Sequence, residues 1–267
     1  MISALGPDGL SGRRPGELLV EEPLQIRLDD RVVATTMRTP GHDFELAVGF
    51  CHAEGLMRPG LPTECRSAAI AGAIAGAMAS AVETSLNVVS VYGGVVAPRT
   101  TAPRLGTISS SCGWCGANSI DELVDRLDVV GPVSVPSLAT LAEVEAGARR
   151  HQRLFAATGA AHAAACFDAA TGEVAVVRED IGRHNAVDKV VGRLRLDDEL
   201  PAAGRGLWVS GRASFEIVQK AWAAGFGLVV SVSAPSALAV STAGRSGITL
   251  VGVARSDGAT VYHTQLA

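Results

Sequence analysis

Residues 207–233, LWVSGRASFEIVQKAWAAGFGLVVSVS, decide the fold. The short apolar run Leu207–Ser210 predicts a buried strand, and the spacing of apolar residues in Phe215–Ala224 predicts an amphipathic helix. A second apolar run, Leu228–Ser233, predicts the next strand. Two buried strands joined through a helix are typical of a parallel pair in a sheet that is covered on both faces.

The same alternation continues on both sides of this stretch. Further strands are expected at 163–167, 174–177, 249–254 and 260–263, and further helices at 185–194 and 237–243. We therefore predict an α/β (α+β) fold of two lobes, in which the C-terminal lobe, residues 136–267, is a mixed sheet covered by helices.

The N-terminal part has a different pattern and is expected to form a lobe of its own over residues 18–135, after a flexible N-terminus of residues 1–17. Strands are expected at 18–28, 32–37 and 86–92, and helices at 119–127 and 137–155, the last long enough to bridge the lobes. Thr39 is predicted to cap a further helix that ends near Glu54. Its expected inward residues are Phe44, Ala47, Val48 and Cys51.

Composition and charge exclude several classes of protein. A length of 267 residues suits two lobes, and a net charge of −4 argues against general nucleic-acid binding, which requires a basic surface. Residues 1–17 lack the apolar run of a secretory signal. The Ala-rich segment 67–82, expected to be helical, is too short to span a membrane. We therefore expect a cytoplasmic protein with no membrane partner.

Reactive chemistry is expected at Cys112–Gly116, which contains a C-x-x-C pair on a predicted loop. This spacing places two sulfurs within reach of each other and is able to lower a thiol pKa, so that thiolate forms at neutral pH. A sulfur carrier, a redox pair and half of a zinc site remain open from the spacing alone. The zinc alternative lacks a second C-x-x-C, and the redox alternative lacks a helix that begins at the first cysteine.

A second group of polar residues follows the predicted strands of the C-terminal lobe. The charged run 179–189 contains Arg183, His184 and Asn185. Two more strand-to-helix junctions contain Ser210, Gly211 and Arg212 in one case and Ser233 and Ser236 in the other. Junctions at one sheet edge suit a ligand with phosphates or a nucleotide. The alternative is that the serines only cap helices and that the charges form a solvated helix start.

His162 and Cys166 raise the question of a metal site. A zinc deaminase requires His-x-Glu and Pro-Cys-x-x-Cys, but position 164 is alanine and Ser111 precedes Cys112. We therefore expect no metal site.

These motifs together resemble the formate dehydrogenase accessory sulfurtransferases, the FdhD family. The resemblance begins near Glu21 and extends in order through the blocks 38–41, 49–55, 112–116, 179–189, 210–212, 220–225, 233–236 and 249–252. It implies a homodimer with a cytidine-deaminase-like C-terminal lobe that lacks the zinc chemistry. One departure is Ala160, where the family has a glycine before the pocket histidine, His162.

The resemblance also implies a function. Cys112 would accept sulfur as a persulfide from a cysteine desulfurase, with help from Cys115. The sulfur would pass to the molybdenum cofactor, bis-molybdopterin guanine dinucleotide, before insertion into the formate dehydrogenase catalytic subunit. The residues implied as further cofactor contacts are Val253, Ala254, Arg255, Ser256, Asp257 and Gly258. The alternatives are a non-catalytic cofactor chaperone and, less well supported, a zinc-dependent hydrolase.

Overall fold

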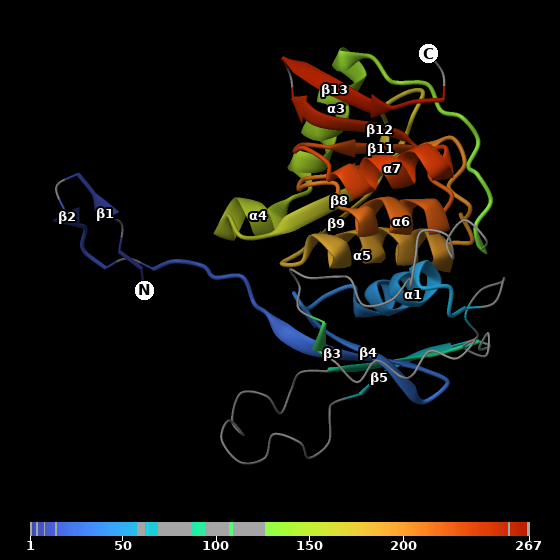
Figure 1. Ribbon diagram of the computed structural model, residues 1–267. Coiled ribbons are helices and arrows are strands. Elements are labelled where there is room, and N and C mark those ends of the chain that lie inside the picture. The colour runs from blue at the N-terminus through green and yellow to red at the C-terminus, as the bar shows by residue number, and fades with distance from the viewer. Residues whose placement is uncertain are drawn as a thin grey trace.

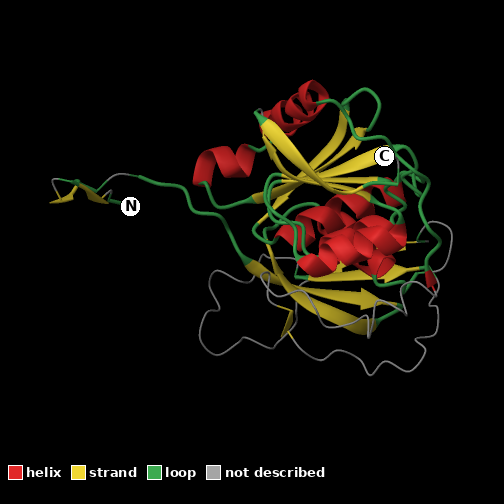
Figure 2. Ribbon diagram, turned by 45° about the horizontal axis from the view of Figure 1, so that its top comes forward, coloured by secondary structure: helices red, strands yellow, loops and turns green. Residues whose placement is uncertain are grey.

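The computed structural model describes residues 2–3, 5–7, 9–13, 15–57, 62, 64–68, 87–93, 107–108, 126–255 and 257–265. Its architecture is mixed α/β, as predicted, with two large sheets and helices between and outside them (Figures 1 and 2). A small hairpin near the N-terminus, β1 (Leu5–Gly6) and β2 (Gly9–Leu10), lies away from the rest of the chain (Figure 1).

The C-terminal sheet is mixed and has the strand order β13-β12-β11-β10-β8-β9. Its central strands β10, β11 and β12 run parallel, and the other neighbours are antiparallel. The strand bounds are β8 His162–Asp168, β9 Val174–Asp180, β10 Arg205–Val209, β11 Leu228–Ser231, β12 Thr249–Arg255 and β13 Gly258–His263. The strand–helix–strand prediction for residues 207–233 is therefore confirmed.

Helices cover both faces of this sheet. One face carries α5 (Arg183–Leu196), α6 (Phe215–Ala223) and α7 (Ala237–Ser246), and the other carries α3 (Leu138–Arg150) (Figures 1 and 2). Successive side chains of β8 point to opposite faces of the sheet. Ala164 and Cys166 therefore belong to the core under α5 and α6, whereas Ala163 and Ala165 pack with α3.

The N-terminal sheet has the order β5-β6-β3-β4-β7. Its strands are β3 Glu22–Leu28, β4 Arg31–Arg38, β5 Glu64–Ala68, β6 Val88–Tyr92 and β7 Thr107–Ile108. Helix α1 (Asp43–Ala53) lies on this sheet and, with its other side, against α5 (Figure 1). A Cβ on Gly49 would overlap the Asp188 carbonyl, and one on Gly192 would overlap the Glu45 carbonyl. The helices thus cross at a distance that only glycine allows.

Several local expectations were wrong. Thr39, the predicted cap, does not cap helix α1, which begins at Asp43 with His42 at its N-cap; the Thr39 hydroxyl instead accepts a hydrogen bond from Ile181 N at 3.1 Å. Phe44, expected to point inward, is 40% exposed. The long helix expected at 137–155 is two helices, α3 and α4 (Arg153–Thr158), so no single helix bridges the lobes.

Residues 128–133 pack on the C-terminal sheet, although they precede the predicted boundary at residue 136. Asp128 O accepts a hydrogen bond from Trp222 Nε1 at 2.7 Å, and Val133 O accepts one from Thr249 Oγ1 at 2.8 Å. The predicted helix at 119–127 and the Ala-rich segment 67–82 lie largely outside the described residues. Among the described helices, none combines the length and apolar character that a membrane crossing requires.

Candidate functional site

The predicted strand-to-helix junctions meet at one edge of the C-terminal sheet. β8 runs antiparallel to both β9 and β10, so its first residue, His162, lies beside Asp180 at the end of β9. The loops after β10 and β11 leave the sheet at this same edge because these strands are parallel. This arrangement brings together three residues that are far apart in sequence: His162, Arg183 and Gly211.

The center of this edge is basic. A Cβ on Gly211 would lie 3.4 Å from Cε1 and Nδ1 of His162 and 3.5 Å from Cδ of Arg183, so the loop backbone packs against both side chains. Burial lowers the pKa of His162, Arg183 and Arg212 lower it further, and Asp180 opposes them. Burial and Arg212 also lower the pKa of Arg183. The arrangement therefore concentrates positive charge in a partly desolvated place.

Arg183 carries an unused donor at this edge. Its Nε is buried and has no hydrogen-bond partner among the described residues. An orphaned donor of this kind costs free energy unless a ligand or water satisfies it. The sequence singled out Arg183 as a cofactor contact, and its orphaned donor is consistent with an anionic ligand, although that contact stays a prediction.

His184 occupies the second helical position of α5 and is held by α6. Its Nε2 lies 3.0 Å from Ser214 Oγ and 3.0 Å from Glu216 Oε2. Burial, followed by the charges of Arg183 and Lys220, lowers the pKa of His184 to about 3. The imidazole is therefore neutral near pH 7, and the Glu216 carboxylate favours the tautomer with its proton on Nε2. Neither Ser214 nor Glu216 was among the predicted site residues.

Asn185 points away from this edge into the contact between the lobes. Its Nδ2 donates to Met37 O at 2.8 Å and to Asp180 Oδ1 at 3.0 Å. Asp180 is fully buried and also pairs with Lys189 at 2.8 Å. The charged run 179–189 thus has two parts: its polar interior joins the lobes, while Arg183 and His184 remain at the sheet edge. The cofactor contact expected of Asn185 stays a prediction that this geometry does not favour.

The serines of the other junctions stabilise the fold. Ser210 Oγ accepts a hydrogen bond from Ala163 N at 2.9 Å, and Ser236 Oγ caps α7 by accepting one from Ala239 N at 3.2 Å. Ser233 O accepts from Ser231 Oγ at 2.7 Å. The helix-cap alternative therefore describes Ser236 well, and the predicted ligand contacts of all three serines stay predictions.

The bulge in β12 is a strained part of the same edge. Val253 has a φ of 52°, which is unfavourable for a β-branched residue, and its N–H donates to Ser233 O at 3.2 Å. Such strain is often found at functional sites. Ala254 is buried, whereas Arg255 and Asp257 are exposed beside Gly258 in the hairpin between β12 and β13. Ser256 lies outside the described residues, and the cofactor contacts expected of this segment remain predictions.

Cys112 and Cys115 also lie outside the described residues. The described cysteines are Cys51, Cys65 and Cys166. Burial raises the pKa of each of these three thiols, that of Cys166 to about 11. They are therefore thiols at neutral pH and are poor nucleophiles.

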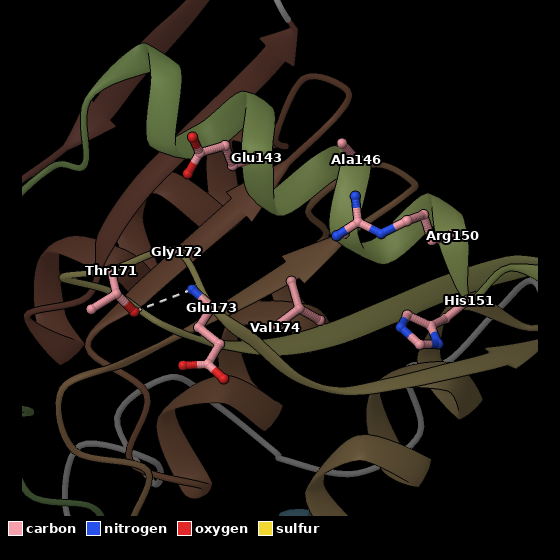
Figure 3. Close-up of a pocket in the computed structure, with 9 residues that line it drawn as sticks. Glu143, Ala146, Arg150, His151, Thr171, Gly172, Glu173 and Val174 are labelled. Carbon is pink, nitrogen blue, oxygen red and sulfur yellow. Dashed lines mark hydrogen bonds between the residues drawn. The ribbon is translucent and has the colours of Figure 1, made fainter.

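A separate hollow of about 400 Å³ lies on the α3 face of the C-terminal sheet (Figure 3). It lies between α3 and the turn from β8 to β9, with Arg150 and His151 at one end and Glu143 toward the other (Figure 3). The residues that line it are Glu143, Ala146, Gly147, Arg150, His151, Thr171, Gly172, Glu173 and Val174. None of these is a predicted site residue, and the basic edge borders the helices of the opposite face. We therefore place the candidate site at the basic edge.

Comparisons with known proteins agree with the resemblance found in the sequence. A family model described as the FdhD/NarQ family matches residues 19–266. A protein of Streptomyces avermitilis named sulfur carrier protein FdhD is 45% identical over 96% of this chain and 90% of its own length. A protein of the same name from Mycobacterium tuberculosis is 44% identical over 93% of this chain and 90% of its own length.

One solved structure shares the fold. It is a crystal structure of a candidate formate dehydrogenase accessory protein from Desulfotalea psychrophila. The match has a TM-score of 0.73 and 22% identity and covers 99% of this chain and 96% of that one.

Proposed function

The chain belongs to the FdhD/NarQ family, and on this premise we propose that it is a sulfur carrier that serves formate dehydrogenase. It would accept sulfur as a persulfide on Cys112 from a cysteine desulfurase and deliver it to bis-molybdopterin guanine dinucleotide before that cofactor enters the formate dehydrogenase catalytic subunit. The observation that carries the proposal is the 45% identity, over 96% of the chain, to a protein named as a sulfur carrier. A homodimer in the cytoplasm is part of the same proposal.

Loading is a thiol–persulfide exchange. The Cys112 thiolate attacks the outer sulfur of the donor persulfide, a new S–S bond forms on Cys112, and the donor cysteine leaves as a thiolate. No separate oxidant is needed, because the sulfane sulfur keeps its oxidation state. The three described cysteines have raised thiol pKa values, which supports assigning this step to the C-x-x-C pair.

Delivery involves the second cysteine. In one form of this step, Cys115 attacks the inner sulfur of the Cys112 persulfide, a Cys112–Cys115 disulfide forms, and the outer sulfur leaves as hydrosulfide to the molybdenum of the cargo. A dithiol reductant then restores both thiols. Alternatively, Cys115 only stabilises the persulfide, and the dithiol reductant itself attacks the inner sulfur, so that the outer sulfur leaves as hydrosulfide to the cargo and the Cys112 thiol is restored.

The basic sheet edge supports cargo binding. Arg183 and Arg212 supply positive charge where the phosphates of a dinucleotide would require it, and the Arg183 Nε has no protein partner among the described residues. His162 lies beside them as a neutral imidazole, because burial and the two arginines lower its pKa. His184 adds a neutral imidazole whose Nε2 is held by Glu216, so its other nitrogen is an acceptor. The edge thus combines cationic donors with one acceptor.

Mass spectrometry tests sulfur loading directly. The purified protein is incubated with a cysteine desulfurase and cysteine, without reductant, and the Cys112 peptide is expected to gain one sulfur atom. Cys112→Ala should abolish both this gain and the activation of formate dehydrogenase, whereas the control Cys65→Ala should keep both. Full activation by Cys112→Ala, without any added sulfur, would instead favour the non-catalytic chaperone.

A further inference from the structure

Basic residues from three separate elements lie at the Gly211 backbone. His162 begins β8, Arg183 begins α5, and Arg212 lies in the loop between β10 and α6. The closest approaches at Gly211 are to the His162 ring and to the Arg183 side chain, at 3.4 and 3.5 Å from a Cβ built at that position. The loop backbone therefore lies beside both side chains, at a distance where an added Cβ would make only ordinary van der Waals contacts.

The two arginines of this cluster form no ion pair with a carboxylate of the described chain. Within the described part of the chain, neither Arg183 nor Arg212 forms an ion pair or a side-chain hydrogen bond, and the buried Arg183 Nε has no partner. Two acids lie near the cluster and offset part of its charge: Asp180, which pairs with Lys189, raises the pKa of His162, and Glu216, which contacts His184, raises the pKa of Arg183. The exposed Arg212 is near enough to lower the pKa of Arg183, and two guanidinium groups placed in this way favour an anion with several oxygens.

His162 is the titratable member of the cluster. It is affected by Arg183 from α5, by Arg212 from the loop before α6, by Asp180 from β9 and by its neighbour His184 on α5. Burial and the two arginines hold the pKa of His162 below its usual value, so the imidazole is neutral at pH 7 when no anion is present. A dianion within about 4–6 Å would favour the imidazolium and reverse this balance.

We propose that His162, Arg183 and Arg212 form an oxyanion subsite that binds a dianionic phosphate-like group and takes up one proton from solvent on His162. The inference deepens the proposed function, because the anion would be a phosphate of the cargo. Binding is tighter at lower pH, and loss of the His162 proton favours release. His162 thereby couples retention of the cargo to the local pH.

Sulfate is the probe that tests proton coupling most cleanly, because its own charge stays constant while a phosphate titrates near neutral pH. Calorimetric titrations in buffers of different ionisation enthalpy give both the affinity and the number of protons taken up. We expect sulfate affinity to fall up to about tenfold per pH unit between the pKa values of free and bound His162. Histidine NMR in the presence and absence of sulfate should show that His162 becomes protonated.

Matched variants separate the contributions of charge and proton. His162→Gln should still bind sulfate, but with an affinity that no longer changes with pH. Arg183→Gln and Arg212→Gln should each weaken binding about tenfold or more at every pH, because each removes charged hydrogen bonds. His151→Gln, in the hollow on the other face, is the control and should leave both affinity and pH dependence unchanged.

Three results would overturn the subsite: no sulfate binding by the wild-type protein, binding that does not depend on pH, or an unchanged pH dependence in His162→Gln. Competition then identifies the natural source of the anion. A nucleoside diphosphate that displaces sulfate more strongly than pyrophosphate supports the cargo, and equal displacement by both overturns that part of the proposal. Sulfur loading on Cys112 is measured separately, so its failure would overturn the carrier function and not the subsite.

Discussion

The buried carboxylate of Asp180 joins the two lobes. Substituting this one residue is the most direct test of how strongly the contact between the lobes stabilises the protein. It accepts hydrogen bonds from Thr39 N at 3.1 Å, Gly182 N at 2.8 Å and Asn185 Nδ2 at 3.0 Å, and it pairs with Lys189 Nζ at 2.8 Å. Four donors thus converge on one carboxylate. Asp180→Asn keeps the shape of the side chain, removes the negative charge and replaces one acceptor oxygen by an NH2 donor.

The loss of unfolding free energy expected for Asp180→Asn follows from the burial of the Asp180–Lys189 ion pair. The Lys189 and Asp180 side chains are 1% and 0% exposed, so the variant leaves an ammonium group in the interior without a counter-charge. Breaking a buried pair in this way costs about 3–5 kcal/mol. The matched control lies at the C-terminal end of α5, where Arg193 and the C-cap residue Asp197 form an ion pair with 44% and 32% exposure. Asp197→Asn should therefore cost less than about 1 kcal/mol.

Urea unfolding followed by circular dichroism measures both variants. Asp180→Asn should lower the free energy of unfolding several times more than Asp197→Asn, with little change in the dependence on urea. Two similar losses below about 1 kcal/mol would show that the buried charge does not hold the lobes together, and would refute the reasoning. Because Asp180 also binds Gly182 N, just before Arg183, the destabilised variant should bind sulfate more weakly.

Two further predictions concern packing and pH. Gly192→Ala should destabilise the protein by at least about 1–3 kcal/mol in urea unfolding, because its methyl group would overlap the Glu45 carbonyl, whereas Gly131→Ala, with open space around it, should have little effect. The His184 pKa falls from 6.5 to about 3 on folding, so the unfolded chain binds the extra proton and stability decreases as the pH drops through this window. The difference in unfolding free energy between wild type and His184→Gln isolates this effect, and a difference that stays constant from pH 7 to about pH 4 would contradict it.

The C-terminal sheet was predictable from the sequence because each strand and helix in it is indicated by a local pattern of apolar residues. Apolar runs joined by amphipathic helices predicted strands such as β10 and β11, and parallel order placed their ends at one edge. The start of α1 was not predictable in this way. Thr39 has the residue type and position of a helix cap, but its hydroxyl binds Ile181, 142 residues away in sequence, and only tertiary structure reveals that competitor.

The charged run 179–189 shows a second limit. The many charged residues in this run predicted a ligand site, but they did not show which side chains face a ligand. Asn185 and Lys189 are four residues apart on α5, which places them on one face of the helix, and both bind Asp180. That spacing was visible in the sequence, whereas the presence of β4 and Thr39 opposite this face was not.

The contacts that residues 179–189 make with the N-terminal lobe limit how far the two lobes are able to move apart. Three contacts connect the lobes beside the basic edge: the hydrogen bonds of Thr39 to the buried Asp180–Lys189 pair, the Arg178–Glu45 ion pair and the close crossing at Gly49. A hinge that opened the lobes would expose buried charges and separate helices packed without Cβ atoms, at a cost of several kcal/mol. The first turn of α5 is therefore fixed by the N-terminal lobe, and Arg183 and His184 are held in place before any ligand arrives. Such preorganisation favours capture of cargo on a rigid body and places any motion needed for sulfur transfer away from the contact between the lobes.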